Sequence, residues 1–187
     1  MKTPGLIVLA LMMSATLIMA QTNAPAVSGT PMTIELRAPH GNTVKLGEAI
    51  PLIVALKNTS DERVEWQEIS YYYKCGQRSD NDDKPHCFPH PAHYFQFIVQ
   101  GPEGNLVPET DLEKDIHGKT NRPAKWDETY LTHGFRPKSR IDYHLNLADL
   151  FQITQPGTYT IQVQRRFMDD PNGALIKSNV LTVTVTQ

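Results

Sequence analysis

The feature that most constrains this chain is an alternation of apolar and polar residues with a period of two. It runs through residues 34–36, 141–145, 159–163 and 180–185. Such alternation is typical of half-buried β-strands, because successive side chains of a strand point to opposite faces of the sheet. Only residues 147–152 have the length and pattern of a short helical turn. We therefore expect the chain to fold mainly as antiparallel sheet.

Further strand-like segments alternate with turn-forming sequences. The segments are residues 50–57, 63–68 and 94–100, and the turns are residues 58–61, 101–104, 155–157 and 169–173. The continuous apolar character of residues 50–57 favours a central strand, and residues 158–185 predict a long hairpin. About seven to nine short strands without crossover helices indicate an all-β fold, an Ig-like antiparallel two-sheet sandwich.

Tyr159 supports the Ig-like arrangement. It follows the turn Gln155-Pro156-Gly157 at the start of a predicted strand, where the tyrosine corner of Ig-like domains ties the strand to the preceding connection. In antibody domains a cysteine stands two residues after this tyrosine, but this chain has Ile161 there. The two cysteines of the chain therefore cannot form the antibody-type bridge between sheets.

The first 20 residues have the pattern of a secretory signal peptide. Lys2 precedes an apolar run that ends at Ala20, and polar residues follow from Gln21. We expect cleavage after Ala20, a flexible leader over residues 21–31 and a single Ig-like domain over residues 32–187. The alternative for residues 1–20 is a retained N-terminal anchor.

Charge and motifs narrow the classes of function. The chain has 18 Lys and Arg residues against 20 Asp and Glu residues, a formal net charge of −2, which argues against a nucleic-acid partner. No span of membrane length is expected once the signal is removed. The sequence has no Gly-x-Ser-x-Gly, His-Glu-x-x-His or phosphate-binding glycine-rich motif. We therefore expect a protein that is not an enzyme and needs no cofactor.

Residues 71–93 differ from the rest of the chain in composition, with aromatic, acidic, cysteine and histidine residues close together. The two cysteines, Cys75 and Cys87, both lie in this segment. In an oxidising compartment they predict a disulfide that closes a loop of about 13 residues. The segment is therefore interpreted as a disulfide-closed loop on the sandwich.

The same segment holds the candidate site residues. His86, His90 and His93 lie close enough in sequence to bind zinc or copper if the backbone brings them together. The favoured interpretation is a surface loop with solvated histidines, because a loop fixed by a disulfide rarely needs a metal. For a protein partner the candidate contacts are Tyr72, Phe88 and His90. The prolines around Phe88 reduce the conformational entropy lost on docking.

Two other patterns favour ordinary structural roles. Asn58-Thr59-Ser60 is formally a glycosylation acceptor but is expected to be a turn after a strand. Arg165 and Arg166 are expected to be solvated charges rather than a polyanion site, given the negative balance.

The strands and turns also resemble a known family. The segments that carry the resemblance are residues 34–37, 44–52, 56–61, 145–151 and 156–163. They look like small secreted bacterial Ig-like domains and are similar to the proteinase-inhibitor domain of a Bacillus intracellular inhibitor and to the propeptide region of deuterolysin-type metallopeptidases. The resemblance implies the sandwich and transfers no catalytic residue, since the shared positions are core and turn residues.

These observations predict a non-enzymatic binding module, secreted or periplasmic in a bacterium, that contacts another protein through loops between strands. Two alternatives stay open. The resemblance implies inhibition of a peptidase, and the histidines of residues 71–93 allow binding of zinc or copper.

Overall fold

The computed structural model describes residues 30–71, 74–75, 87–88, 90–117, 119, 128–167 and 173–187. One sheet has the order β1-β3-β9, from β1 (Met32–Arg37), β3 (Pro51–Asn58) and β9 (Arg140–Asn146). The other sheet is built from β2 (Thr43–Lys45), β7 (Gln96–Gln100), β10 (Gly157–Arg166), β11 (Leu175–Lys177) and β12 (Leu181–Thr186). In this second sheet β10 lies between β7 on one side and β11 and β12 on the other.

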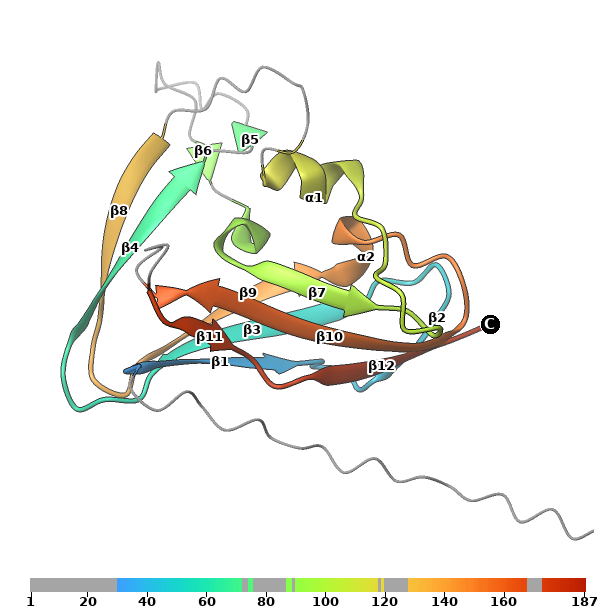
Figure 1. Ribbon diagram of the computed structural model, residues 1–187, viewed down its shortest axis with the longest axis horizontal. Coiled ribbons are helices and arrows are strands. Elements are labelled where there is room, and N and C mark those ends of the chain that lie inside the picture. The colour runs from blue at the N-terminus through green and yellow to red at the C-terminus, as the bar shows by residue number, and fades with distance from the viewer. Residues whose placement is uncertain are drawn as a thin grey trace, which may run out of the picture.

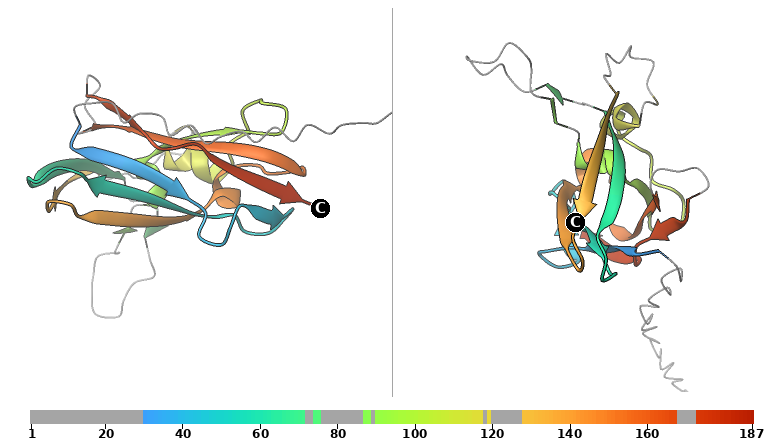
Figure 2. Two further views of the ribbon diagram at one scale, coloured as in Figure 1. Left: turned by 90° about the horizontal axis from the view of Figure 1, so that it is seen from below. Right: turned by 90° about the vertical axis from the view of Figure 1, so that its left-hand side faces the viewer.

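The two sheets pack against each other as the layers of a sandwich (Figure 1; Figure 2, left). Their inward-facing side chains form the core, which includes Met32, Leu36, Leu52, Val54, Leu56, Phe95, Val99, Leu147, Tyr159, Ile161, Val163 and Val183. Full burial of one such aliphatic or aromatic side chain stabilises the fold by about 1.5–3 kcal/mol. The all-β, Ig-like two-sheet sandwich predicted from the alternation is confirmed.

The continuous apolar strand β3 occupies the centre of its sheet, as predicted, with β1 and β9 on its two sides. Leu52 and Val54 point inward and Ile53 and Ala55 point to the opposite face, yet all four side chains are buried. On the outward side, Ile53 lies between Arg37 and His144, and Ala55 lies between Glu35 and Asp142. A run without polar alternation is therefore the signature of a strand shielded on both faces.

The chain changes sheets directly after β1. Gly41 has a φ of +94°, a conformation that glycine adopts at little cost because it has no side chain. After this turn, β2 joins the second sheet. There β2 runs parallel to β12, so the sandwich is not wholly antiparallel as predicted. The amide of Asn179, between β11 and β12, bridges the sheets. Its Oδ1 accepts from Leu36 N and its Nδ2 donates to Leu36 O, both at 2.9 Å.

A second pair of strands extends away from the sandwich. Strands β4 (Val64–Tyr71) and β8 (Glu128–Phe135) form an antiparallel two-stranded ribbon that continues the β3–β9 pair beyond a corner (Figure 1). Short strands β5 (Lys74–Cys75) and β6 (Cys87–Phe88) pair with each other farther along the chain. Among the described residues, no helix is long and apolar enough to cross a membrane.

Asn58 fixes the corner between β3 and β4. Its Nδ2 donates to the carbonyl oxygens of Glu62, Phe135 and Arg136 at 2.7, 3.3 and 3.1 Å, and its Oδ1 accepts from the backbone N–H and hydroxyl of Ser60. The amide is fully buried. The predicted turn at this asparagine is confirmed, and the buried amide offers no acceptor for a glycan in the folded chain.

In the described part of the chain, three short helices connect the strands: η1 (Pro91–Tyr94), α1 (Asp111–Ile116) and α2 (Leu147–Leu150). The third is the short turn predicted over residues 147–152. Tyr159 lies at the start of β10 and its hydroxyl donates to the carbonyl oxygen of Gln155 at 2.7 Å, so the predicted tyrosine corner is confirmed.

The outer faces of the two sheets differ in chemistry. The outer face of the β1-β3-β9 sheet carries a charge network in which Arg37 Nη2 lies 2.7 Å from Asp142 Oδ2, and Arg140 bonds to Asp142 and approaches Glu35. These interactions hold the pKa of Asp142 below its ordinary value, chiefly through the hydrogen bond from Arg140.

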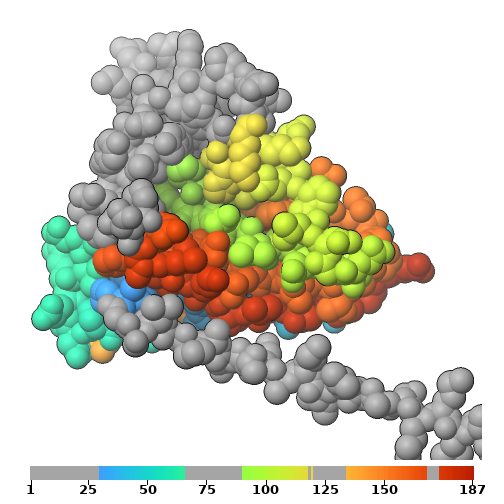
Figure 3. All heavy atoms as spheres, in the orientation of Figure 1, coloured from blue at the N-terminus to red at the C-terminus, as the bar shows by residue number. Residues whose placement is uncertain are grey.

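The outer face of the second sheet consists mainly of uncharged hydroxyl and amide side chains, with Lys45, Arg166 and Lys177 at its borders, and we call it the Thr/Gln face. Its members are Thr43, Gln96, Gln100, Thr158, Thr160, Gln162, Gln164, Thr182, Thr184 and Thr186. Strands β10 to β12, coloured orange to red, form much of the near surface in Figure 3.

Candidate functional site

The candidate site is the η1–α1 end, defined as residues 90–94 and 110–117 together with the described part of the 71–89 segment. Each helix begins at a side-chain cap. The Nδ1 of His90 accepts from the backbone N–H of Ala92 at 3.2 Å, and Pro91 occupies the first position of η1. The hydroxyl of Thr110 accepts from the backbone N–H of Glu113 at 3.3 Å and starts α1.

Two histidines and a glutamate join η1 to α1. The Nδ1 of His93 lies 3.0 Å from the carbonyl oxygen of Ile116, and the rings of His93 and His117 are stacked with centroids 6.1 Å apart. The Nε2 of His117 in turn lies 3.1 Å from Oε1 of Glu113, one turn earlier in α1. His93 therefore joins η1 to the end of α1 through one polar contact and one ring contact.

Glu113 is the most unusual member of the cluster because it is only 2% exposed. Glutamate is almost never fully buried unless it is paired, since removing a carboxylate from water is costly. His117 supplies the pairing group, while the second oxygen, Oε2, has no hydrogen-bond partner within the described residues. The pair lies within α1 and its C-cap and carries a cost in desolvation, whereas His93 makes the contacts that join α1 to η1.

The electrostatics of His90 agree with its capping role. An Nδ1 that accepts a hydrogen bond must be unprotonated, so the neutral ring is the one that fits the structure. Burial holds the pKa of His90 below its ordinary value, against the opposing effect of the carboxylates of Glu113 and Asp149.

Arg165 lies at the same end and corrects a prediction. It was expected to be a solvated charge, but it is only 5% exposed and its guanidinium carbon lies 5.7 Å from the ring centroid of Tyr94. In β10 it continues the inward-facing series of Ile161 and Val163, so its stem packs on the core side. Arg166 is exposed, as predicted, and donates to the carbonyl oxygen of Gly173.

The structure places the predicted site residues unevenly. Tyr72 and His86 lie outside the described residues, as do the signal peptide and the leader up to residue 29. For Cys75, Cys87 and Phe88 only the backbone is described, and Cys75 lies directly opposite Cys87 in the β5–β6 pair. This register suits a disulfide between cross-strand neighbours, and the bond itself stays a prediction.

The metal hypothesis also stays a prediction. His90 and His93 lie at opposite ends of η1, and each has its Nδ1 engaged with backbone. Within the ranges that the structure describes, no three His, Cys, Asp or Glu side chains come together as a metal site.

The sequence did not lead us to the acidic residues of the η1–α1 end. Glu113, Asp115 and His117 were not among the candidate residues, although the first two are buried. One local signal was available: Thr110 and Glu113 have the spacing of a helix capping box, Thr-x-x-Glu. Six residues of helix are too few for a visible apolar period.

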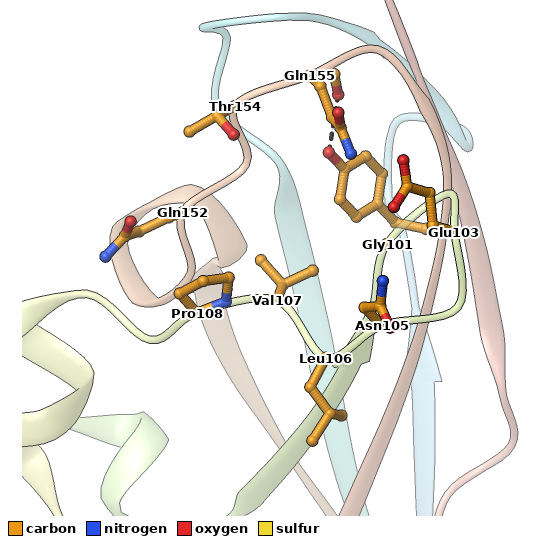
Figure 4. A pocket seen from close by; sticks show the side chains of 10 residues that line it. Gly101, Glu103, Asn105, Leu106, Val107, Pro108, Gln152, Thr154 and Gln155 are labelled. Atoms are coloured by element: carbon orange, nitrogen blue, oxygen red, sulfur yellow. Dashed lines mark hydrogen bonds between the residues drawn. The ribbon is translucent and has the colours of Figure 1, made fainter.

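A hollow lies at the other end of β7, where the chain leaves the sheet after Gly101. It measures about 200 Å³ and lies between residues 101–108 and 152–155 (Figure 4). Leu106, Val107, Pro108 and the Tyr159 ring supply its apolar lining, and the carboxylate of Glu103 lies at the rim with amide and hydroxyl side chains. The Tyr159 hydroxyl donates to Gln155 and so stabilises the loop.

Comparison with known proteins identifies no family. No family model matches the chain, and no curated protein matches it either, so the resemblance to the Bacillus inhibitor domain and the deuterolysin propeptide region finds no support. Among solved structures, the CARDB domain of a Pyrococcus furiosus protein, in complex with di-metal ions, matches at 13% identity with a TM-score of 0.37, over 83% of this chain and 87% of that chain.

A β-glucosidase from Listeria innocua also matches, in complexes with laminaribiose and with isofagomine. Both complexes show 13% identity and a TM-score of 0.35, over 83% and 82% of this chain. This chain matches only 16% of the glucosidase length. At these values none of the likenesses bears on function.

Proposed function

We propose that this protein is an exported, non-enzymatic binding module that contacts another protein through the η1–α1 end. The observation that carries the proposal is the contact of His93 with Ile116 and His117, beside the buried Glu113, which holds η1 against α1. Recognition surfaces are commonly loops held in place by a rigid scaffold.

The surface above this cluster has the composition of a protein contact rather than of a core. Asp111 is exposed and Lys114 partly exposed on α1, and Lys119 follows the helix with its Nζ bonded to Glu109. Tyr94 and His93 are half-buried beside them. Aromatic groups flanked by exposed charges of both signs are typical of the polar rim and central anchors of protein interfaces.

Of the predicted contact residues, His90 caps η1, so its removal would disturb the scaffold as well as any contact. Phe88, the predicted apolar anchor, is therefore the better probe. We add Lys114 of α1, which is partly exposed and makes a surface ion pair with Asp111.

The experiment is affinity capture from an extract of the exported fraction, with the purified chain and the double variant Phe88→Ala/Lys114→Ala as bait. Lys57→Ala, on the outer face of β3, is the matched control. We expect the double variant to lose a captured protein that the control retains, at an unchanged melting temperature. An identical captured set for all three baits would contradict the proposal, and capture of a peptidase with blocked turnover would make the module an inhibitor.

A further inference from the structure

The proposed contact at the η1–α1 end does not involve the Thr/Gln face. The composition of this face is unusual for a solvated surface. Its strands place no Asp or Glu on the outer side in the described chain, and its cations, Lys45, Arg166 and Lys177, lie at its borders. Soluble surfaces normally intersperse charges of both signs. The outer face of the other sheet does this through Arg37 and Asp142.

The strand registers arrange the hydroxyl and amide groups in rows. Thr182, Thr160 and Gln100 stand opposite one another on β12, β10 and β7. The adjacent row contains Thr158 and Thr184 with Thr43 of β2. Neighbouring strands lie about 4.8 Å apart and alternate residues of one strand about 6.8 Å apart. The face therefore presents hydrogen-bonding groups on a regular two-dimensional grid.

Part of the hydrogen-bonding capacity of this grid is unused. Gln164 Nε2 donates to Gln96 Oε1 at 2.7 Å, which orders that amide pair. The hydroxyls of Thr158, Thr182 and Thr184 have no hydrogen-bond partner within the part of the chain that the structure describes. Each hydroxyl can donate one hydrogen bond and accept two. The free groups are held in place by a packed sheet, so little side-chain entropy is lost when a ligand binds.

The composition disfavours other classes of ligand. Protein interfaces take most of their energy from Trp, Tyr and Arg anchors, and threonine is under-represented among them. Only Ile98 and Leu175 add apolar surface on the outer side of these strands. Nucleic acids need a cluster of cations along their phosphates, which this face does not supply. A neutral ligand with many hydroxyl groups matches the lack of charge.

We propose that the Thr/Gln face binds a neutral polysaccharide. The hydroxyls of Thr158, Thr182 and Thr184 exchange hydrogen bonds with successive sugar hydroxyls along the chain. Gln100 contributes its Nε2 and Gln162 its Oε1, since Gln100 Oε1 accepts from Thr160 and Gln162 Nε2 donates to Ser178. Binding is therefore insensitive to ionic strength, because no ion pair contributes to it. This inference does not depend on the proposed contact at the η1–α1 end.

The test is co-sedimentation of the purified chain with three insoluble neutral polysaccharides: cellulose, chitin and curdlan. The variant Thr182→Val/Thr184→Val removes two hydroxyls and keeps two β-branched side chains, so the sheet is preserved. Thr33→Val, on the outer side of β1, is the matched control. We expect the wild type and the control to sediment with at least one polysaccharide, and the double variant to bind about tenfold more weakly.

Three results would overturn the proposal. The first is no sedimentation of the wild type with any of the three polysaccharides. The second is equal retention of the wild type and a double variant whose circular-dichroism melting curve shows that it is folded. The third is self-association of the wild type in analytical ultracentrifugation that the double variant abolishes, because the face would then bind a second copy of the chain.

Discussion

The hydroxyl of Tyr159 donates to the carbonyl oxygen of Gln155 at 2.7 Å, four residues earlier in the chain, while its ring packs in the core. This bond ties the start of β10 to the connection that precedes it. The Tyr159 ring also lines the hollow beside Val107. It is the local feature that most specifically marks the Ig-like arrangement.

Removing that hydroxyl should cost stability without disturbing the core. We expect Tyr159→Phe to lower the free energy of unfolding by about 0.5–1.5 kcal/mol, since one buried hydrogen bond is lost and the ring remains. Urea denaturation followed by circular dichroism measures this. Tyr143→Phe, on half-buried β9, is a useful comparison, and an unchanged midpoint for Tyr159→Phe would argue against a stabilising tyrosine corner.

Replacing Asn58 should lower the free energy of unfolding more than replacing an exposed asparagine does. Asn58→Ala leaves the carbonyl oxygens of Glu62, Phe135 and Arg136 without their donor, and we expect a loss of about 2–4 kcal/mol. The matched control is Asn105→Ala, whose side chain is exposed at the rim of the hollow. Equal denaturation midpoints for the two variants would show that the corner does not depend on this amide.

Protonation of His90 should lower the stability of the folded protein in mild acid. Its pKa is lowered in the folded state by burial, so below about pH 6.5, the ordinary pKa, the unfolded chain binds the proton first. The contribution of the neutral ring is complete above that pH and declines as the pH falls toward the folded-state pKa. His90→Asn keeps a capping oxygen and removes the titration.

The measurement is the urea midpoint between pH 5 and pH 8 for the wild type, His90→Asn and the exposed control His144→Asn. The wild type and His144→Asn should lose stability toward pH 5 more steeply than His90→Asn. Identical slopes for all three proteins would remove His90 from the pH dependence.

Cys75 and Cys87 should form a disulfide in the exported protein. They stand opposite each other in the β5–β6 pair, and closing a loop of about 13 residues stabilises the fold by roughly 3 kcal/mol in the chain-entropy model. Non-reducing peptide mapping should recover the two cysteine peptides as one species. Two alkylatable thiols in the exported protein would refute the bond.

The sandwich was predictable because its strands alternate. The phase of that alternation also contained the position of Arg165: with Tyr159, Ile161 and Val163 facing inward, the next residue of the series must face inward too. Charge alone suggested a solvated side chain. The structure shows that the strand phase, with the Tyr94 ring beside the guanidinium, determines where it lies.

Strand β8 escaped prediction for a local reason. Gly134 interrupts its pattern, and a Cβ at this position would meet the guanidinium of Arg63, which lies directly before β4. The i,i+4 spacing of Glu113 and His117 is visible in the sequence, but the contacts of His93 with His117 and Ile116 depend on how η1 and α1 pack, and sequence spacing contains no information on that packing.

The most direct test of the proposed binding surface is site-specific photo-crosslinking in the cells that make the protein. A photoreactive amino acid replaces Lys114 on α1 in one variant and Lys57 on the outer face of β3 in the other. The account predicts a discrete crosslinked protein from position 114 and none from position 57. Equal crosslinking from both positions, or none from position 114, would contradict binding through the η1–α1 end.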